Sequence, residues 1–184
     1  FPAKPLGCYG DGGAIFTNED ELSGLIRSIK NHGMGEHKYE HINVGVNSRL
    51  DTLQAAVLIQ KIKILNSEII SRNKVASNYN DALSNSSLIL PPISGDNSYA
   101  WAQYTVRHEN RNEIMNCLSE AGIPTSVYYP LALNDQVAYQ DCNVVSSGTP
   151  NTKKFCQQVF SLPISPYLDE GNQEKIIQAL LKLC

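Results

Sequence analysis

The spacing of apolar residues in the first part of the chain predicts a strand followed by a helix. The run Ala14 to Thr17 is short and apolar, which indicates a buried strand. Asn18 is a good N-cap, and Glu21 three residues later has the spacing of a capping box. The apolar stripe of the predicted helix consists of Leu22, Leu25, Ile26 and Ile29. The helix is expected to end near residues 31–33, and a strand–helix unit of this kind is typical of α/β proteins.

A polar segment separates this unit from a second, longer helix. Residues 34–48 show no sustained periodicity and predict a long loop, which in a compact domain is usually functional or disordered. Asp51 then has Gln54 at the reciprocal position of a second capping box. Apolar positions with an i, i+3, i+4 rhythm follow, so we expect a helix that continues to about Leu83.

The second half alternates short strands with helices. Residues 99–107 and 125–129 are rich in aromatic and β-branched side chains, which predicts two strands. Asn110 is placed to cap a helix that stops at Gly122, a typical C′ glycine. Further helices are expected near residues 152–160 and from 170 to 183. The whole pattern predicts an α/β fold.

Charge and cysteine content exclude several classes of function. The net charge is −3 and the basic residues are scattered, so we expect no nucleic-acid partner. No apolar run reaches the roughly 18 residues of a membrane-spanning helix, so we expect no membrane association. The five cysteines are widely spaced and form no CxxC pair, which favours reduced thiols and a cytoplasmic protein.

The histidines do not indicate a metal site. His37 and His41 lie in the polar loop, where no helix would bring them to one face, and no acidic partner completes a zinc site. His32 is expected near a helix end, where a capping or packing role is common.

Lys4 is the residue on which a chemical interpretation depends. A lysine becomes a useful amine nucleophile when its pKa is depressed or when it is held as an imine. The glycines that follow it, which let the backbone approach a ligand closely, are Gly7, Gly10, Gly12 and Gly13. Taken alone, Lys4 is more simply a solvated surface charge, and Cys8 beside it a small residue that fills space.

A series of motifs changes this interpretation. The segment FPAK-LG-YGDGGAIFTN around Lys4 resembles the Schiff-base segment of the DegT/StrS-type sugar aminotransferases, a branch of the fold-type I enzymes that use pyridoxal 5′-phosphate (PLP). The resemblance continues through NHG at 31–33, KYEH at 38–41, VGVNSRLDTLQAAVL at 44–58, WAQYTVR at 101–107, GIPTSVYYP at 122–130 and SLPISPYLDE at 161–170. The blocks keep their order and spacing over nearly the whole chain, so together they are far more specific than any one alone.

The resemblance implies roles for three residues. Lys4 would form the Schiff base with PLP. Asn47 would contact the PLP phosphate and Arg49 would face the substrate, both reaching across a homodimer interface into the partner's active site. Amide and guanidinium donors suit phosphate and carboxylate groups. Without the resemblance, Asn47 is simply a turn residue and Arg49 a surface charge.

The resemblance also points to a substrate class. Tyr128-Tyr129-Pro130 is similar to the family's substrate-side motif, in which the first position is often histidine. A tyrosine there can hydrogen-bond a sugar hydroxyl or phosphate, although both tyrosines could equally serve strand packing. Asn134, together with VGVNSRLDTLQAA, is closest to the subgroup that acts on UDP-linked 3-keto hexuronic acids.

The implied fold is the C-terminal half of a fold-type I PLP-dependent transferase. Residues 1–87 would be the end of the PLP-binding large domain with its long connecting helix, and residues 88–184 the small C-terminal α/β domain. The implied reaction moves an amino group from L-glutamate to a nucleotide-linked keto sugar, a UDP-3-keto hexuronate, for surface polysaccharide synthesis.

Two alternatives remain open. One is a 4-keto-hexose aminotransferase, and the other is a catalytically incomplete fragment that serves only as a dimerisation scaffold. In the family, the groups that hold the pyridine ring precede the lysine. We therefore expect these 184 residues alone to be inactive and the longer parent polypeptide to be the enzyme.

Overall fold

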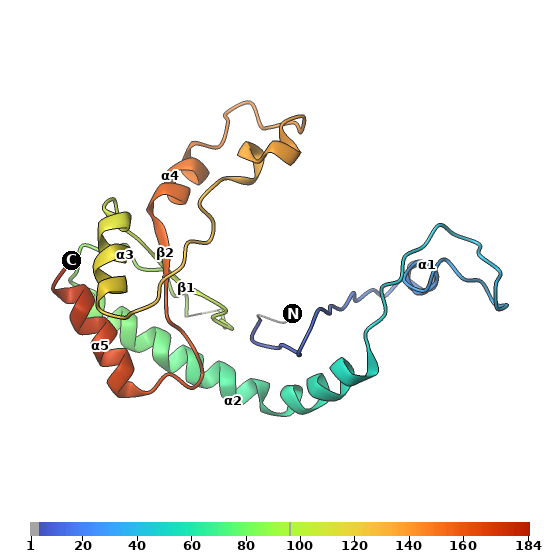
Figure 1. The fold of residues 1–184 in the computed structure, drawn as a ribbon, viewed down its shortest axis with the longest axis horizontal. Helices are drawn as coiled ribbons and strands as arrows, with labels where there is room; N and C mark the ends of the chain where they lie inside the picture. The colour runs from blue at the N-terminus through green and yellow to red at the C-terminus, as the bar shows by residue number, and fades with distance from the viewer. Residues whose placement is uncertain (1–3, 96) are drawn as a thin grey trace. The chain divides into compact units, whose positions relative to one another are not determined.

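The structure, a computed structural model, describes residues 4–95 and 97–184. The chain forms two compact units, of which the first ends at Leu65 and the second begins at Asn66. The helices are α1 (Asp20–Ile29), α2 (Thr52–Leu83), α3 (Arg111–Glu120), α4 (Pro150–Gln158) and α5 (Glu170–Leu181), and the strands are β1 (Tyr104–Arg107) and β2 (Val159–Leu162) (Figure 1). Two 3-10 turns, η1 (Leu133–Asp135) and η2 (Val137–Tyr139), precede α4. The expected division at residue 87 into parts of a larger protein stays a prediction.

In the first unit, α1 has the expected apolar stripe, but two local predictions are wrong. The helix begins at Asp20 with Glu19 as N-cap, and not at Asn18. The hydroxyl of Thr17 accepts a hydrogen bond from the Glu19 N–H at 3.1 Å, and this local turn delays the start of the helix. The predicted strand from Ala14 to Thr17 is absent, and Phe16 is 92% exposed. A strand needs a hydrogen-bonding neighbour, and the described residues provide none for this segment.

The segment between α1 and α2 is a loop, as predicted, but a tightly folded one. Isolated bridges pair Asn31 with Asn47 and Met34 with His41. Gly33 has a φ of +71°, and a Cβ built on it would lie 1.8 Å from the carbonyl oxygen of Asn43. Only glycine fits there, because the backbone takes a left-handed conformation and touches the other side of the loop.

The second unit is built on an antiparallel pair of strands. Tyr104 of β1 lies opposite Leu162 of β2, and Arg107 lies opposite Val159. The largest fully buried side chains come from α2, α3, α5 and both strands, and they are Tyr79, Leu83, Tyr104, Val106, Leu118, Phe160 and Leu180. In Figure 1, α3, α5 and the second half of α2 gather beside the strands. This unit therefore closes a core of its own.

The predicted α/β character of the second half is confirmed, although the strands are shorter than expected. β1 occupies only the last four residues of the predicted segment 99–107. Residues 125–129 contribute one isolated bridge, between Ser126 and Ser161, rather than a strand. The predicted helix end at Gly122 is confirmed, because its φ is +73° and the Ile123 N–H donates to the Leu118 carbonyl at 2.8 Å.

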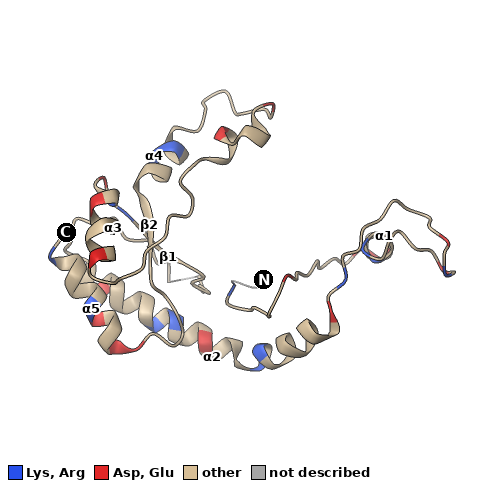
Figure 2. Ribbon diagram, viewed as in Figure 1, with Lys and Arg blue, Asp and Glu red and all other residues tan. Residues whose placement is uncertain are grey.

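Charge is distributed along both units. Figure 2 shows Lys and Arg interspersed with Asp and Glu along the helices. Among the ion pairs, Lys74 with Glu170 and Lys153 with Asp135 join exposed or half-exposed partners, both at 2.9 Å. Such surface pairs contribute little to stability. None of the helices formed by residues 4–95 and 97–184 is long and apolar enough to cross a membrane.

Candidate functional site

Lys4 lies at the start of the glycine-rich segment, and its side chain is exposed. The motif residues before it, 1–3, lie outside the described residues. Cys8 is 6% exposed, and its thiol donates to the carbonyl of Gly10 at 3.0 Å. The interpretation of Cys8 as a small buried residue of the loop is therefore confirmed.

Asn47 and Arg49 lie in a turn that is fixed to the end of α1. The Val46 N–H donates to the Ile29 carbonyl at 2.8 Å, and the Ser48 N–H donates to the Lys30 carbonyl at 2.9 Å. These bonds satisfy carbonyl groups that have no partner within the helix. Asn47 therefore lies between two backbone anchors, while its side chain and that of Arg49 are exposed.

The side chains of Asn47 and Arg49 form one polar pair. Arg49 Nε donates to Asn47 Oδ1 at 3.3 Å. This contact uses the amide oxygen, so the amide presents its two Nδ2 N–H bonds and the guanidinium presents its terminal nitrogens. The pair is thus a set of hydrogen-bond donors with one positive charge, which suits a phosphate or a carboxylate.

Tyr128 and Tyr129 lie in the second unit, just after the bridge from Ser126 to β2. The two side chains are 42% and 67% exposed, and their ring centroids lie 5.8 Å apart in an edge-to-face arrangement. Exposure at this level argues against the alternative that both serve strand packing. The phenol groups remain available to a ligand.

The structure brings the predicted site residues together in two pairs. Asn47 contacts Arg49, and Tyr128 contacts Tyr129. Within the described part of the first unit, no hydrogen bond or ion pair joins Lys4 to Asn47 or Arg49. The described residues also hold no group of three or more His, Cys, Asp or Glu side chains that could bind a metal ion.

Gln54 has a contact that the sequence did not reveal. Its predicted role was the reciprocal cap of Asp51, but its Oε1 accepts a hydrogen bond from the backbone N–H of Tyr9 at 2.8 Å. The side chain of Gln54 therefore reaches the segment that carries Lys4. The amide N–H is present at every non-proline residue, so no feature of the sequence marked this pairing.

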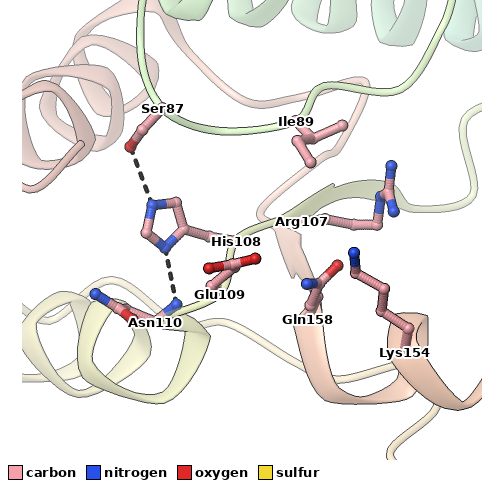
Figure 3. Close-up of a pocket in the computed structure, with 8 residues that line it drawn as sticks. All are labelled: Ser87, Ile89, Arg107, His108, Glu109, Asn110, Lys154 and Gln158. Atoms are coloured by element: carbon pink, nitrogen blue, oxygen red, sulfur yellow. Dashed lines mark hydrogen bonds between the residues drawn. The ribbon is translucent and has the colours of Figure 1, made fainter.

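The second unit contains a pocket of about 480 Å³ whose lining includes none of the predicted site residues (Figure 3). In it, His108 Nδ1 accepts from the Asn110 N–H at 3.0 Å, so the ring proton lies on Nε2, which donates to Ser87 Oγ at 3.0 Å. Both ring nitrogens are thus used within the protein. Arg107 lies over the ring of Phe155 at 4.1 Å, a contact that fixes its guanidinium. The two hydrogen bonds of the His108 ring favour a structural role for its imidazole.

Comparison with known proteins gives one consistent result. Residues 1–181 match the family described as the DegT/DnrJ/EryC1/StrS aminotransferase family. The UDP-2-acetamido-2-deoxy-3-oxo-D-glucuronate aminotransferase of Pseudomonas aeruginosa is 50% identical over 180 residues, which cover 98% of this chain and 49% of that protein.

Solved structures agree with this match. A crystal structure of a DegT/DnrJ/EryC1/StrS aminotransferase from Brucella abortus is 44% identical with a TM-score of 0.95, and the match covers all of this chain and 49% of that one. NtdA from Bacillus subtilis with bound cofactor PMP is 28% identical with a TM-score of 0.83, over 99% of this chain and 44% of that one. The fold is therefore that of one half of these enzymes, and the chain spans about half the length of the curated relatives that it matches.

Proposed function

This chain belongs to the DegT/DnrJ/EryC1/StrS aminotransferase family, and we propose that its protein transfers an amino group from L-glutamate to a UDP-linked 3-keto hexuronate with PLP as cofactor. The observation that carries the proposal is the 50% identity, over 98% of this chain, to an enzyme named for such a substrate. That name puts the keto group at carbon 3, which favours this substrate over a 4-keto hexose. Five cysteines that all stay free are compatible with the cytoplasm as the compartment.

The residues of the first unit fit PLP chemically. PLP has an aldehyde that an amine can bind and a phosphate that needs hydrogen-bond donors. Lys4 provides an exposed amine, and glycines follow it in the segment that would lie against the ring. Asn47 and Arg49 provide the donors. We assign Lys4 to the aldehyde and Asn47 to the phosphate; when bound, PLP supplies the electron sink of the reaction.

The chain's own residues then have distinct tasks. The Lys4 amine holds and moves the proton at the carbon that gains or loses the amino group, first as base and then as acid. Arg49 binds the carboxylate of L-glutamate or the acidic sugar, and its contact with Asn47 keeps the guanidinium beside the phosphate site. Tyr128 and Tyr129 orient the sugar through their hydroxyl groups.

Labelling of Lys4 tests the assignment. In the full-length protein, borohydride treatment with PLP followed by peptide mass mapping should place a phosphopyridoxyl group on Lys4. Lys4→Arg should remove the label, whereas Lys30→Arg, at an exposed lysine of the same unit, should keep it. Release of 2-oxoglutarate from L-glutamate beyond one equivalent per site should depend on a UDP-linked 3-keto hexuronate. Turnover with a 4-keto hexose instead would select the alternative of a 4-keto-hexose aminotransferase. No label on Lys4 in any variant would select the alternative of a fragment that serves only as a dimerisation scaffold.

The arrangement of the site across a homodimer has a separate test. We propose that Asn47 and Arg49 of one subunit serve the Lys4 of the other. Mixed dimers of Lys4→Arg and Asn47→Ala chains should then regain about a quarter of the wild-type activity, because half of the dimers are mixed and one of their two sites is intact. If both residues serve the same subunit's site, mixing should regain none.

A further inference from the structure

We propose that Gln54 is a positioning residue that fixes the Lys4-bearing segment to the first turn of α2. The inference rests on the proposed role of Lys4. The contact behind it is the hydrogen bond from the Tyr9 N–H to Gln54 Oε1 at 2.8 Å, between residues 45 positions apart. The Tyr9 side chain is 88% exposed, so its own packing does not hold the segment in place.

The backbone beside this bond is also shaped to receive Gln54. A Cβ built on Gly10 would lie 3.0 Å from Gln54 Nε2 and 3.5 Å from its Cδ. A side chain at position 10 would therefore require the amide to move by a few tenths of an ångström. At Gly13, three residues later in the same segment, an added Cβ would meet nothing within 4 Å. Of these two glycines, Gly10 is the one that lies close to Gln54.

The position of Gln54 in the fold gives this bond a functional consequence. α2 begins at Thr52, directly after the turn that carries Asn47 and Arg49. One amide side chain therefore ties the Lys4 segment of one site to the helix that follows the Asn47 and Arg49 turn, which under the proposed function serves the site of the other subunit. Because misplacing a catalytic group by about 1 Å can reduce a rate roughly a hundredfold, a bond that is weak in stability can be strong in catalysis.

Three variants of the full-length protein separate positioning from general stability. Gln54→Met keeps the length of the side chain but removes the acceptor, whereas Gln54→Glu keeps an acceptor oxygen. Gln60→Met, at an exposed glutamine of α2 that bonds Lys63, is the matched control. Hydrogen exchange of the Tyr9 amide should quicken about fivefold in Gln54→Met, the factor that corresponds to one ordinary hydrogen bond, and stay near the wild-type rate in the other two.

The catalytic readout should follow the exchange. We expect Gln54→Met to lower kcat with little change in KM, and Gln54→Glu to restore most of it. Gly10→Ala should shift kcat in the same direction as Gln54→Met, and Gly13→Ala should leave the exchange of the Tyr9 amide at the wild-type rate. Equal exchange in Gln54→Met and Gln60→Met would overturn the inference, as would faster exchange with an unchanged kcat.

Failure of the proposed function can be recognised separately. If the wild-type protein transfers no amino group, the extent of borohydride labelling at Lys4 replaces kcat as the readout. Weaker labelling in Gln54→Met than in Gln54→Glu would still support positioning. Equal labelling, or none in either, would overturn it.

Discussion

Tyr79 offers a prediction in which the sign of the effect changes with pH. The ring is fully buried against Tyr104, with centroids 5.0 Å apart, and its hydroxyl donates to the Pro163 carbonyl at 2.9 Å. Tyr79→Phe keeps the ring and removes this bond. Since the net contribution of such a bond is about 1 kcal/mol and Pro163 is half-buried, we expect the free energy of unfolding to fall by about 1 kcal/mol at pH 8.

At alkaline pH the same hydroxyl destabilises the fold. Burial raises the pKa of Tyr79 well above its ordinary value of 10.0, so in the folded state it keeps its proton when the unfolded chain has lost it. The unfolded state then binds fewer protons, and stability falls as the pH rises above about 10. At pH 11 this loss is roughly 1.4 kcal/mol for one tyrosine, and phenylalanine does not incur it.

The two effects together predict a crossover. Tyr79→Phe should be less stable than the wild type by about 1 kcal/mol at pH 8 and slightly more stable, by about 0.4 kcal/mol, at pH 11. Urea midpoints from circular dichroism and from the fluorescence of the single tryptophan, Trp101, measure this difference; Trp101 is in the same core. Tyr9→Phe, at an exposed ring, is the control. If wild type and Tyr79→Phe differ in their free energy of unfolding by the same amount at both pH values, the inference that burial raises the pKa of Tyr79 is refuted.

Three further predictions concern the stability of single elements. Leu118→Ala removes a fully buried side chain of α3 and should cost about 2–5 kcal/mol in urea unfolding. Gly122→Ala, at a φ of +73°, should cost about 1 kcal/mol, whereas Gly24→Ala inside α1 should stabilise by about 0.5–1 kcal/mol; thermal melting distinguishes the two signs. Asn172 bonds lower the pKa of Asp169, so Asp169→Ala should lower the melting temperature at neutral pH, and the difference should vanish as the pH falls through that lowered pKa.

The helices could be predicted from the sequence because their signals are local. The predicted end of the long helix at about Leu83 is confirmed, and α5 begins where expected, with Asp169 accepting from the Asn172 N–H at 2.9 Å. The strands could not be predicted as well, because a strand exists only where a neighbour pairs with it. The segments 14–17 and 125–129 have strand composition, but they lack a full pairing partner among the described residues.

The candidate site could be predicted only in part. Lys4, Asn47 and Arg49 were found through motifs, and their assigned roles stay predictions. The contact between Asn47 and Arg49 was not expected from the motif, although two residues of one turn are close by necessity. The role of Gln54 was missed for a different reason: its partner is a backbone amide that lies 45 residues away and has no signature in the sequence.

The two units hold their residues in place by different means. In the described part of the first unit, Cys8 and Leu58 are the buried apolar residues, whereas the second unit has a continuous apolar core. The Asn47 turn is therefore held by backbone bonds to the end of α1 and by the close approach at Gly33, and the Lys4 segment by the Gln54 bond. Such bonds contribute little to the free energy of unfolding, but they fix the orientation of the backbone segments that they join. Substitutions in the first unit should accordingly change the geometry of the site more than the free energy of unfolding. Substitutions in the second unit should change the free energy of unfolding more than the geometry of the site.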